Sequence, residues 1–105
     1  MPWRETFHEV PSIPAAHIRF RRSEAPPPFS YAITLELMIG DELHTVRLWD
    51  NADGLDEHHE HAYTCSGGKQ DPVILEFRST NEAMAAAIDK GRKRAGQIVR
   101  QWSAS

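Results

Sequence analysis

The most regular hydrophobic pattern in the chain is an alternation over residues 31–39. Every second side chain there is apolar, as expected for a strand with one buried face: Tyr31, Ile33, Leu35, Leu37 and Ile39. Gly40-Asp41 follows and fits a two-residue hairpin turn, in which glycine takes the position that requires positive φ. We therefore predict that residues 42–49 return as the antiparallel partner strand.

Weaker patterns flank this hairpin on both sides. Residues 17–22 alternate between basic and apolar side chains, which predicts a short half-buried strand, and residues 72–79 predict a last strand. The segment between residues 50 and 72 is polar and rich in turn formers, so we expect a long loop with no more than a short extended piece at 59–64. Residues 1–16 contain three prolines and no sustained period, which predicts an irregular N-terminal arm.

One long helix is predicted over residues 80–102. Ser79 and Glu82 have the spacing of a capping box at its start. A stripe of apolar and small residues follows at alternating spacings of four and three: Met84, Ile88, Gly91, Ala95, Ile98 and Trp102. The elements together predict an α+β domain over residues 17–105, a small antiparallel β-meander of about four strands with the helix packed on one face.

Length and composition limit the class of protein. A chain of 105 residues, 40% hydrophobic and 26% charged, has room for one small domain. Its single cysteine, Cys65, excludes an intrachain disulfide framework and a zinc site built from several thiolates. No apolar run approaches the roughly 20 residues of a membrane span, and no secretory leader opens the chain, so we expect a cytoplasmic protein with no membrane contact.

Charge is unevenly distributed along the chain. The net charge is −3, but residues 41–82 carry ten acids against three bases, and residues 83–105 carry one acid against five bases. This pattern excludes a uniformly basic nucleic-acid binder and allows a local basic patch. The positions that we expect to contact RNA phosphates lie on the predicted strand at 17–22 and on the helix: Arg19, Arg21, Lys90, Lys93 and Arg94.

Candidate chemistry concentrates at residues 47–61, RLWDNADGLDEHHEH, where a strand ends. The candidate catalytic residues are Arg47, Asp50, Asn51, His58, His59 and His61. Histidines that titrate near neutrality suit acid–base catalysis, and Arg47 would stabilise developing phosphate charge. The alternatives are a metal site and a solvated turn in which the histidines have no catalytic role.

A tight metal site is not expected, and neither is a cofactor. His58 and His59 are adjacent, so in an extended chain their side chains point to opposite faces. Only His59 and His61 would converge, which leaves Asp50 or Asp56 to complete a site across a glycine-containing turn. Such a chelate would be weak, because a closed tetrahedral site needs four ligands held by further contacts.

The stretch from the hairpin into RLWDNADGLDEHHEH resembles the TumE-like family of toxin–antitoxin proteins, as does the later stretch DPVILEFRSTNEAM. The likeness covers about residues 30–90. Four positions match the family motif directly: Asp50, Asn51, Gly54 and His58. Residues 55–57 depart from the Lys-Gly-Asp that the family prefers, and residues 59–61 replace its closing Arg-His with one extra residue.

The resemblance implies a small cytoplasmic toxin, encoded beside a helix-turn-helix antitoxin and acting on RNA or translation. Our first hypothesis is therefore a ribonuclease-like toxin that uses histidine acid–base chemistry without a metal, because the ribose 2′-hydroxyl can serve as the nucleophile. The alternative is a non-catalytic protein-binding module, whose acidic loop docks onto a basic or helix-turn-helix partner.

Overall fold

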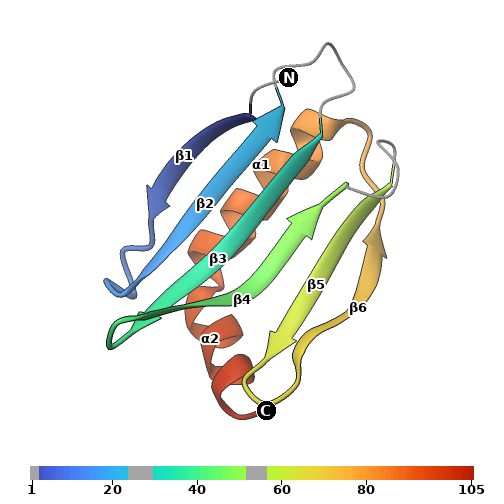
Figure 1. The fold of residues 1–105 in the computed structure, drawn as a ribbon. Helices are drawn as coiled ribbons and strands as arrows, with labels where there is room; N and C mark the ends of the chain where they lie inside the picture. The colour runs from blue at the N-terminus through green and yellow to red at the C-terminus, as the bar shows by residue number, and fades with distance from the viewer. Residues whose placement is uncertain (1–2, 24–29, 52–56) are drawn as a thin grey trace.

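A six-stranded antiparallel sheet forms the main layer of the structure, and each strand lies beside the next one along the chain (Figure 1). The computed structural model describes residues 3–23, 30–51 and 57–105. The strands are β1 (Trp3–Glu9), β2 (Ala16–Ser23), β3 (Tyr31–Ile39), β4 (Glu42–Asp50), β5 (His58–Thr64) and β6 (Gly68–Leu75). Two helices follow, α1 (Thr80–Lys93) and α2 (Ala95–Ser103).

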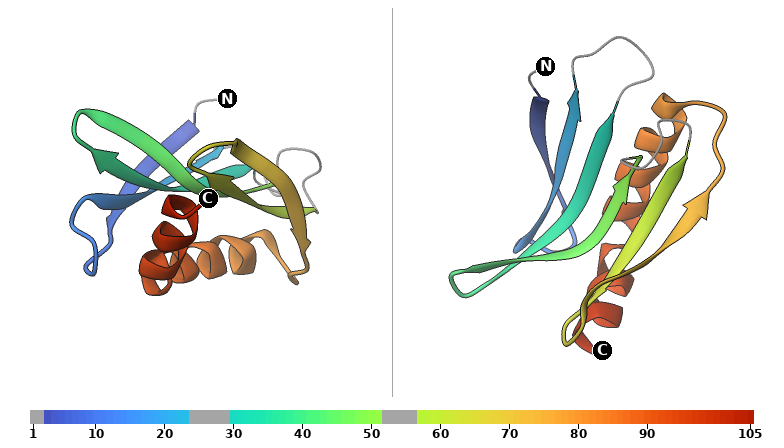
Figure 2. Two further views of the ribbon diagram at one scale, coloured as in Figure 1. Left: turned by 90° about the horizontal axis from the view of Figure 1, so that it is seen from below. Right: turned by 45° about the vertical axis from the view of Figure 1, so that its right-hand side comes forward.

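Both helices pack against the same face of the sheet (Figure 2). The core between the two layers includes Ile18, Ile33, Leu35, Trp49, Met84, Ala87, Ile98 and Trp102. Gly91 allows the close approach of α1, because a Cβ at this position would lie 3.0 Å from Cδ1 of Ile18 and 3.5 Å from Cη2 of Trp49. The predicted role of this glycine in the helix stripe is therefore confirmed.

Two local predictions are also confirmed. Strands β3 and β4 form the expected hairpin around Gly40, whose φ is +59°. At the start of α1, the Ser79 hydroxyl accepts a hydrogen bond of 3.1 Å from the Glu82 backbone N–H. Turn and cap signals identified these positions because each depends on a few adjacent residues.

The predicted number of strands was wrong: the sheet has six strands rather than about four. Residues 3–9, expected to be irregular, form the edge strand β1, which pairs along its length with β2. Six of its seven residues are exposed, so the strand has no buried apolar side to produce an alternating pattern.

The region expected to be a long loop contains β5 and most of β6. His58, His59, Glu60 and His61 are buried in β5 although all four are polar, and hydrophobic periodicity does not detect such a strand. Strand β6 begins at Gly68 and accommodates Pro72, as an edge strand can.

The single long helix was also wrong, because the helix breaks at Arg94. This residue has φ −109° and ψ 13°, and its backbone N–H donates a 2.8 Å hydrogen bond to the Lys90 carbonyl. Helix α2 then runs at an angle to α1 (Figure 2). The buried stripe continues across the break through Gly91, Ala95 and Ile98, so the sequence pattern is the same with or without the change of direction.

Candidate functional site on the open sheet face

The face of the sheet opposite the helices, called here the open face, carries polar side chains from the central strands. Directly opposed residues on neighbouring strands share a face, so the pairing gives the order of side chains across it. One row across strands β2 to β5 consists of Arg21, Ala32, Asp50 and His59. The adjacent row consists of Arg19, Thr34, Leu48 and His61.

Asp50, His59 and His61 form one cluster on this face. Oδ1 of Asp50 lies 3.7 Å from Nδ1 of His59 and 3.9 Å from Nε2 of His61, and the two imidazole centroids are 6.2 Å apart. The predicted convergence of His59 and His61 is thus confirmed. A carboxylate beside two imidazoles gives this cluster groups that can accept, hold and return a proton.

The hydrogen bonds of His61 fix which of its nitrogens is available. Nδ1 lies 3.0 Å from the Gln70 carbonyl oxygen. A carbonyl only accepts, so Nδ1 is the protonated nitrogen and a neutral ring carries its lone pair on Nε2. The side chain is 10% exposed, against 3% for His59. His61 is therefore the more accessible histidine of the cluster.

His59 is held between two carboxylates. Its Nε2 donates to Oε1 of Glu57 at 3.0 Å, while its buried Nδ1 has no hydrogen-bond partner in the described part of the chain. Asp50 is the carboxylate nearest to that nitrogen. Nδ1 of His59 and Nε2 of His61 therefore face the same oxygen of Asp50, which lies between the two rings.

The charge of Asp50 also affects the tyrosines around the site. Burial, and after it the charge of Asp50, raise the pKa of Tyr31 and the pKa of Tyr63. Both phenols are thereby kept protonated well above neutral pH. They can donate hydrogen bonds but do not supply a second negative charge next to Asp50.

Arg47 lies on the helix-covered face rather than in this cluster. Together with Lys90 it binds the buried Glu60 carboxylate, and we call these three residues the buried ion cluster. Lys90 Nζ lies 2.8 and 2.9 Å from the two Glu60 oxygens, Arg47 Nη1 contacts Oε2, and the Trp49 indole N–H donates to Oε1 at 2.9 Å. Lys90, which we expected to contact RNA phosphates, is half-buried in this cluster.

His58 and Asn51 also have structural contacts away from the open face cluster. The Tyr31 hydroxyl is hydrogen-bonded to Nδ1 of His58 at 2.9 Å, and the edge of that imidazole packs against Phe77. Asn51 is fully buried, and its Oδ1 accepts a 2.9 Å hydrogen bond from the Tyr31 backbone N–H. These contacts join the ends of β3, β4 and β5, so both residues shape the sheet beneath the cluster.

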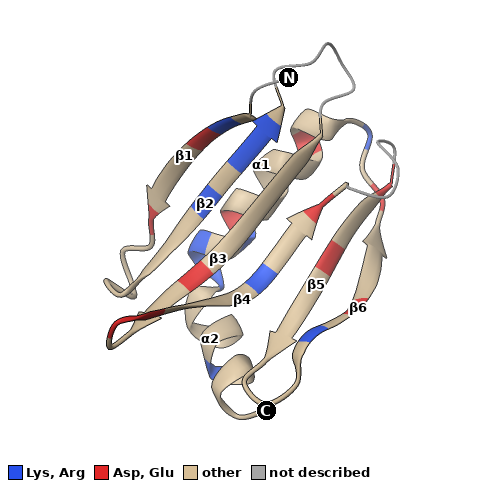
Figure 3. Ribbon diagram, in the orientation of Figure 1, with Lys and Arg blue, Asp and Glu red and all other residues tan. Residues whose placement is uncertain are grey.

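The predicted RNA-contacting residues are divided between the two sides of the sheet. Lys93 and Arg94 are exposed on the helices, and Lys93 pairs with Asp89 at 3.1 Å. Arg19 and Arg21 lie on the open face with the cluster. Basic residues recur along β2 (Figure 3). Only these two of the five share a face with Asp50, His59 and His61.

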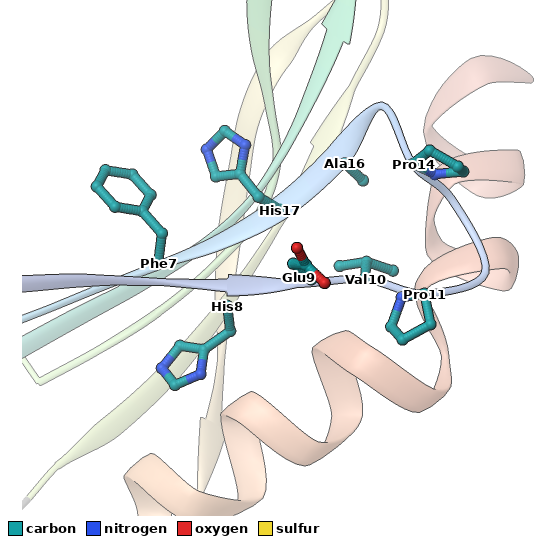
Figure 4. Close-up of a pocket in the computed structure, with 8 residues that line it drawn as sticks. All are labelled: Phe7, His8, Glu9, Val10, Pro11, Pro14, Ala16 and His17. Atoms are coloured by element: carbon teal, nitrogen blue, oxygen red, sulfur yellow. The ribbon is translucent and has the colours of Figure 1, made fainter.

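Arg19 and Arg21 differ in their contacts. The Arg19 guanidinium lies 3.1 Å from Glu36 and 3.6 Å from Glu5, and it stands over the Phe7 ring at 5.4 Å. Phe7 in turn packs edge-on against His17 with ring centroids 5.5 Å apart, on the same side of the β1–β2 hairpin (Figure 4). In the described ranges, Arg21 has no comparable carboxylate or ring contact.

The sequence analysis missed three residues that shape this region. Glu60 was hidden because buried carboxylates are rare and it stood in an apparent loop. Gln70 acts through its backbone carbonyl, which no side-chain pattern reveals. Trp3 was assigned to an irregular arm, although an exposed tryptophan on a strand is a detectable signal for a binding surface.

No group of three or more His, Cys, Asp or Glu side chains within residues 3–23, 30–51 and 57–105 has the arrangement of a metal site. Neither of the helices in those ranges is long and apolar enough to cross a bilayer. Gly54 of the family motif and Asp56 of the metal argument lie outside the described residues. Comparison with protein-family models, curated proteins and solved structures finds no match to this chain, so the TumE-like resemblance stays a prediction.

Proposed function

We propose that this protein is the toxin of a TumE-like toxin–antitoxin pair and that it cleaves RNA at the Asp50–His59–His61 cluster. In this proposal it acts in the cytoplasm and is neutralised by a helix-turn-helix antitoxin encoded beside it. The observation that supports the proposal is the position of the cluster: two histidines and one carboxylate converge on a sheet face that also carries Arg19 and Arg21.

The reaction that fits these groups is an internal transesterification of RNA. Nε2 of His61 takes the proton from a ribose 2′-hydroxyl, and the 2′-oxygen attacks the adjacent phosphorus. The bond from phosphorus to the 5′-oxygen breaks, and His61 returns the proton to that oxygen. The products are a 2′,3′-cyclic phosphate and a 5′-hydroxyl, and no water or metal is consumed.

Asp50 and His59 act in this scheme as positioning residues. The negative charge of Asp50, whose Oδ1 lies 3.9 Å from Nε2 of His61, stabilises the imidazolium that forms while that nitrogen holds the proton. Nδ1 of His59 lies 3.7 Å from the same oxygen of Asp50, so His59 flanks the carboxylate. Arg47 has no role at the phosphate in this scheme, because its guanidinium is bound to Glu60 beneath the sheet.

Induced expression in a bacterial host tests the proposal. We expect the intact chain to arrest growth and His61→Asn to restore growth, since asparagine keeps polarity but cannot transfer a proton. His8→Asn is the matched control: it removes a histidine from the helix-covered side of β1, opposite Ile18, and should leave the arrest intact. Colony counts and total-RNA integrity after induction are the measurements.

Co-expression with the neighbouring gene completes the test. Relief of arrest by a helix-turn-helix neighbour would support the antitoxin assignment. Normal growth with intact RNA, together with stable co-purification of that neighbour, would instead favour the non-catalytic binding module. The acidic loop on which that alternative depends includes Asp53 and Asp56, which are outside the described residues.

A further inference from the structure

A hollow of about 290 Å³ lies on the open face beside β2 and is lined by Trp3, Arg21 and Ala32. Ala32 is the directly opposed neighbour of both Arg21 and Asp50, so the hollow adjoins the catalytic cluster along one row of the sheet. Its volume is near the lower end of small-molecule sites, which suits a single planar group rather than a folded partner.

The Arg21 guanidinium provides unused hydrogen-bonding capacity at this hollow. Its Nε is buried without a hydrogen-bond partner, and no carboxylate among the described residues pairs with the guanidinium, so a phosphate would be bound by its terminal nitrogens. Glu5 stands directly opposite on β1, but its carboxylate contacts Arg19 instead. A half-buried, unpaired guanidinium is well suited to bind a phosphate through two parallel hydrogen bonds.

Trp3 is the second residue lining the hollow that can contact a ligand. It is 53% exposed, whereas Trp49 and Trp102 are 2% and 7% exposed. An exposed indole next to an arginine offers a stacking surface for a base together with a contact for its phosphate. The third lining residue, Ala32, is small and leaves room above the sheet for the stacked ring.

The hollow and His61 are separated by a distance that a short single strand can cover. Arg21 is on β2 and His61 on β5, three strands away, which corresponds to about 14 Å between backbones at roughly 4.8 Å per strand. The intervening positions Ala32 and Thr34 have short side chains. A strand of RNA can therefore cross the sheet from β2 towards β5 without meeting a large side chain on β3.

From this arrangement we infer that the hollow is a nucleotide subsite for single-stranded RNA, with one base stacked on Trp3 and its phosphate bound by Arg21. The subsite places a phosphate further along the same strand at His61. This inference deepens the proposed function and rests on it for the identity of the ligand. It makes the protein selective for unpaired RNA, because a base inside a duplex cannot stack on Trp3.

Binding of a 2′-O-methyl RNA oligonucleotide tests the subsite separately from catalysis. This probe lacks the free 2′-hydroxyl, so it is bound without being cleaved. By fluorescence anisotropy of a labelled oligonucleotide, Trp3→Ala is expected to weaken binding by roughly 5- to 150-fold, and Trp3→Phe by much less. Arg21→Gln should also weaken binding. It should reduce the slope of log K against log salt concentration by about 1, the contribution of one phosphate contact.

Arg100→Gln is the matched control, since it removes an exposed cation of α2 on the helix side and should leave affinity unchanged. Intrinsic fluorescence gives a second readout, because Trp3 is the exposed indole and should be quenched by a single strand and not by an abasic one. Unchanged affinity in Trp3→Ala, equal binding of duplex RNA, or equal competition by a poly-glutamate peptide would overturn the inference.

The subsite and the cleavage proposal fail in different ways. If wild-type protein cleaves no RNA but binds the oligonucleotide in a manner that depends on Trp3 and Arg21, the subsite stands and the proposed reaction is wrong. If RNA is cleaved through His61 while Trp3→Ala and Arg21→Gln bind normally, the reaction stands and the subsite is wrong.

Discussion

Glu60→Ala is expected to lower the free energy of unfolding by about 3–5 kcal/mol, because it leaves two cations without their buried counter-charge. Glu60 is 7% exposed and receives hydrogen bonds from Arg47, Lys90 and the Trp49 indole. Removing the carboxylate leaves the Arg47 guanidinium without a counter-charge, although the Arg47 side chain is only 12% exposed. Urea denaturation of both proteins at neutral pH measures the difference.

The same residue predicts how stability depends on pH. Burial raises the pKa of Glu60, but hydrogen bonds from Lys90, Arg47 and Trp49, with the charge of Lys90, outweigh burial and hold the pKa below its ordinary value. A pKa that is lower in the folded state gives stability that is present above the unfolded value of about 4.3 and is lost as the pH falls through the folded value. The stability difference between wild type and Glu60→Gln should therefore shrink in acid.

Glu76→Ala is the control for this prediction, since Glu76 is exposed and its removal should change the free energy by no more than about 0.5 kcal/mol. A Glu60→Ala protein as stable as Glu76→Ala would show that the buried ion cluster contributes little. The buried ion cluster also supports the candidate site. Glu60 lies between His59 and His61 on β5, and its contacts hold that strand from the opposite face.

The second large effect is expected on catalysis. His61→Asn should reduce the rate of RNA cleavage by the purified protein by about 10²- to 10⁴-fold, the usual contribution of a group that transfers protons in the transition state. His17→Asn is the control, because His17 lies on the open face outside the cluster and pairs with Glu36. Rates are measured on a labelled single-stranded RNA, with thermal unfolding recorded for each variant.

The Asp50→Asn variant tests whether Asp50 acts through His61 or independently of it. If Asp50 acts through His61, its substitution lowers the rate in the wild-type background and has little further effect in the His61→Asn background. Additive losses would mean that Asp50 contributes without His61, and an unaltered rate in His61→Asn would remove the histidine from the mechanism.

The parts of the fold that could be predicted are those set by adjacent residues. The β3–β4 hairpin follows from Gly40, and the start of α1 follows from Ser79 and Glu82. Gly91 was identifiable as a close-approach position because it interrupts an otherwise larger stripe. In each case the physical cause lies within a few residues of its effect.

The missing strands and the helix break have a different origin. Strand β1 is exposed on both faces, and β5 buries charged and polar groups whose partners come from distant elements, such as Lys90 for Glu60. Arg94 leaves helical geometry without a proline or a glycine at that position to mark it. These features depend on tertiary pairing, which hydrophobic periodicity along the chain does not record.

The candidate site was predictable in part for the same reason. An alternating strand requires that His59 and His61 share a face and that His58 does not, and this follows from sequence alone. The same alternation places Arg47 and Asp50, three positions apart on β4, on opposite faces, but the strand was expected to end at residue 49, before Asp50. Arg21 is unpaired because the Glu5 carboxylate contacts Arg19 instead, and no local sequence pattern indicates which of the two arginines Glu5 contacts.

In the proposed reaction, His61 cleaves RNA by using the ribose 2′-hydroxyl of its substrate. The most direct measurement compares two single-stranded oligonucleotides incubated with tag-free protein in the presence of EDTA: one all-RNA, the other with 2′-deoxyribose at each position that is cut in the first. Mass spectrometry should find 2′,3′-cyclic phosphate and 5′-hydroxyl ends from the first and intact chain from the second. Cleavage of the deoxy-substituted strand, loss of all activity in EDTA, or an all-RNA strand that stays intact would contradict the account.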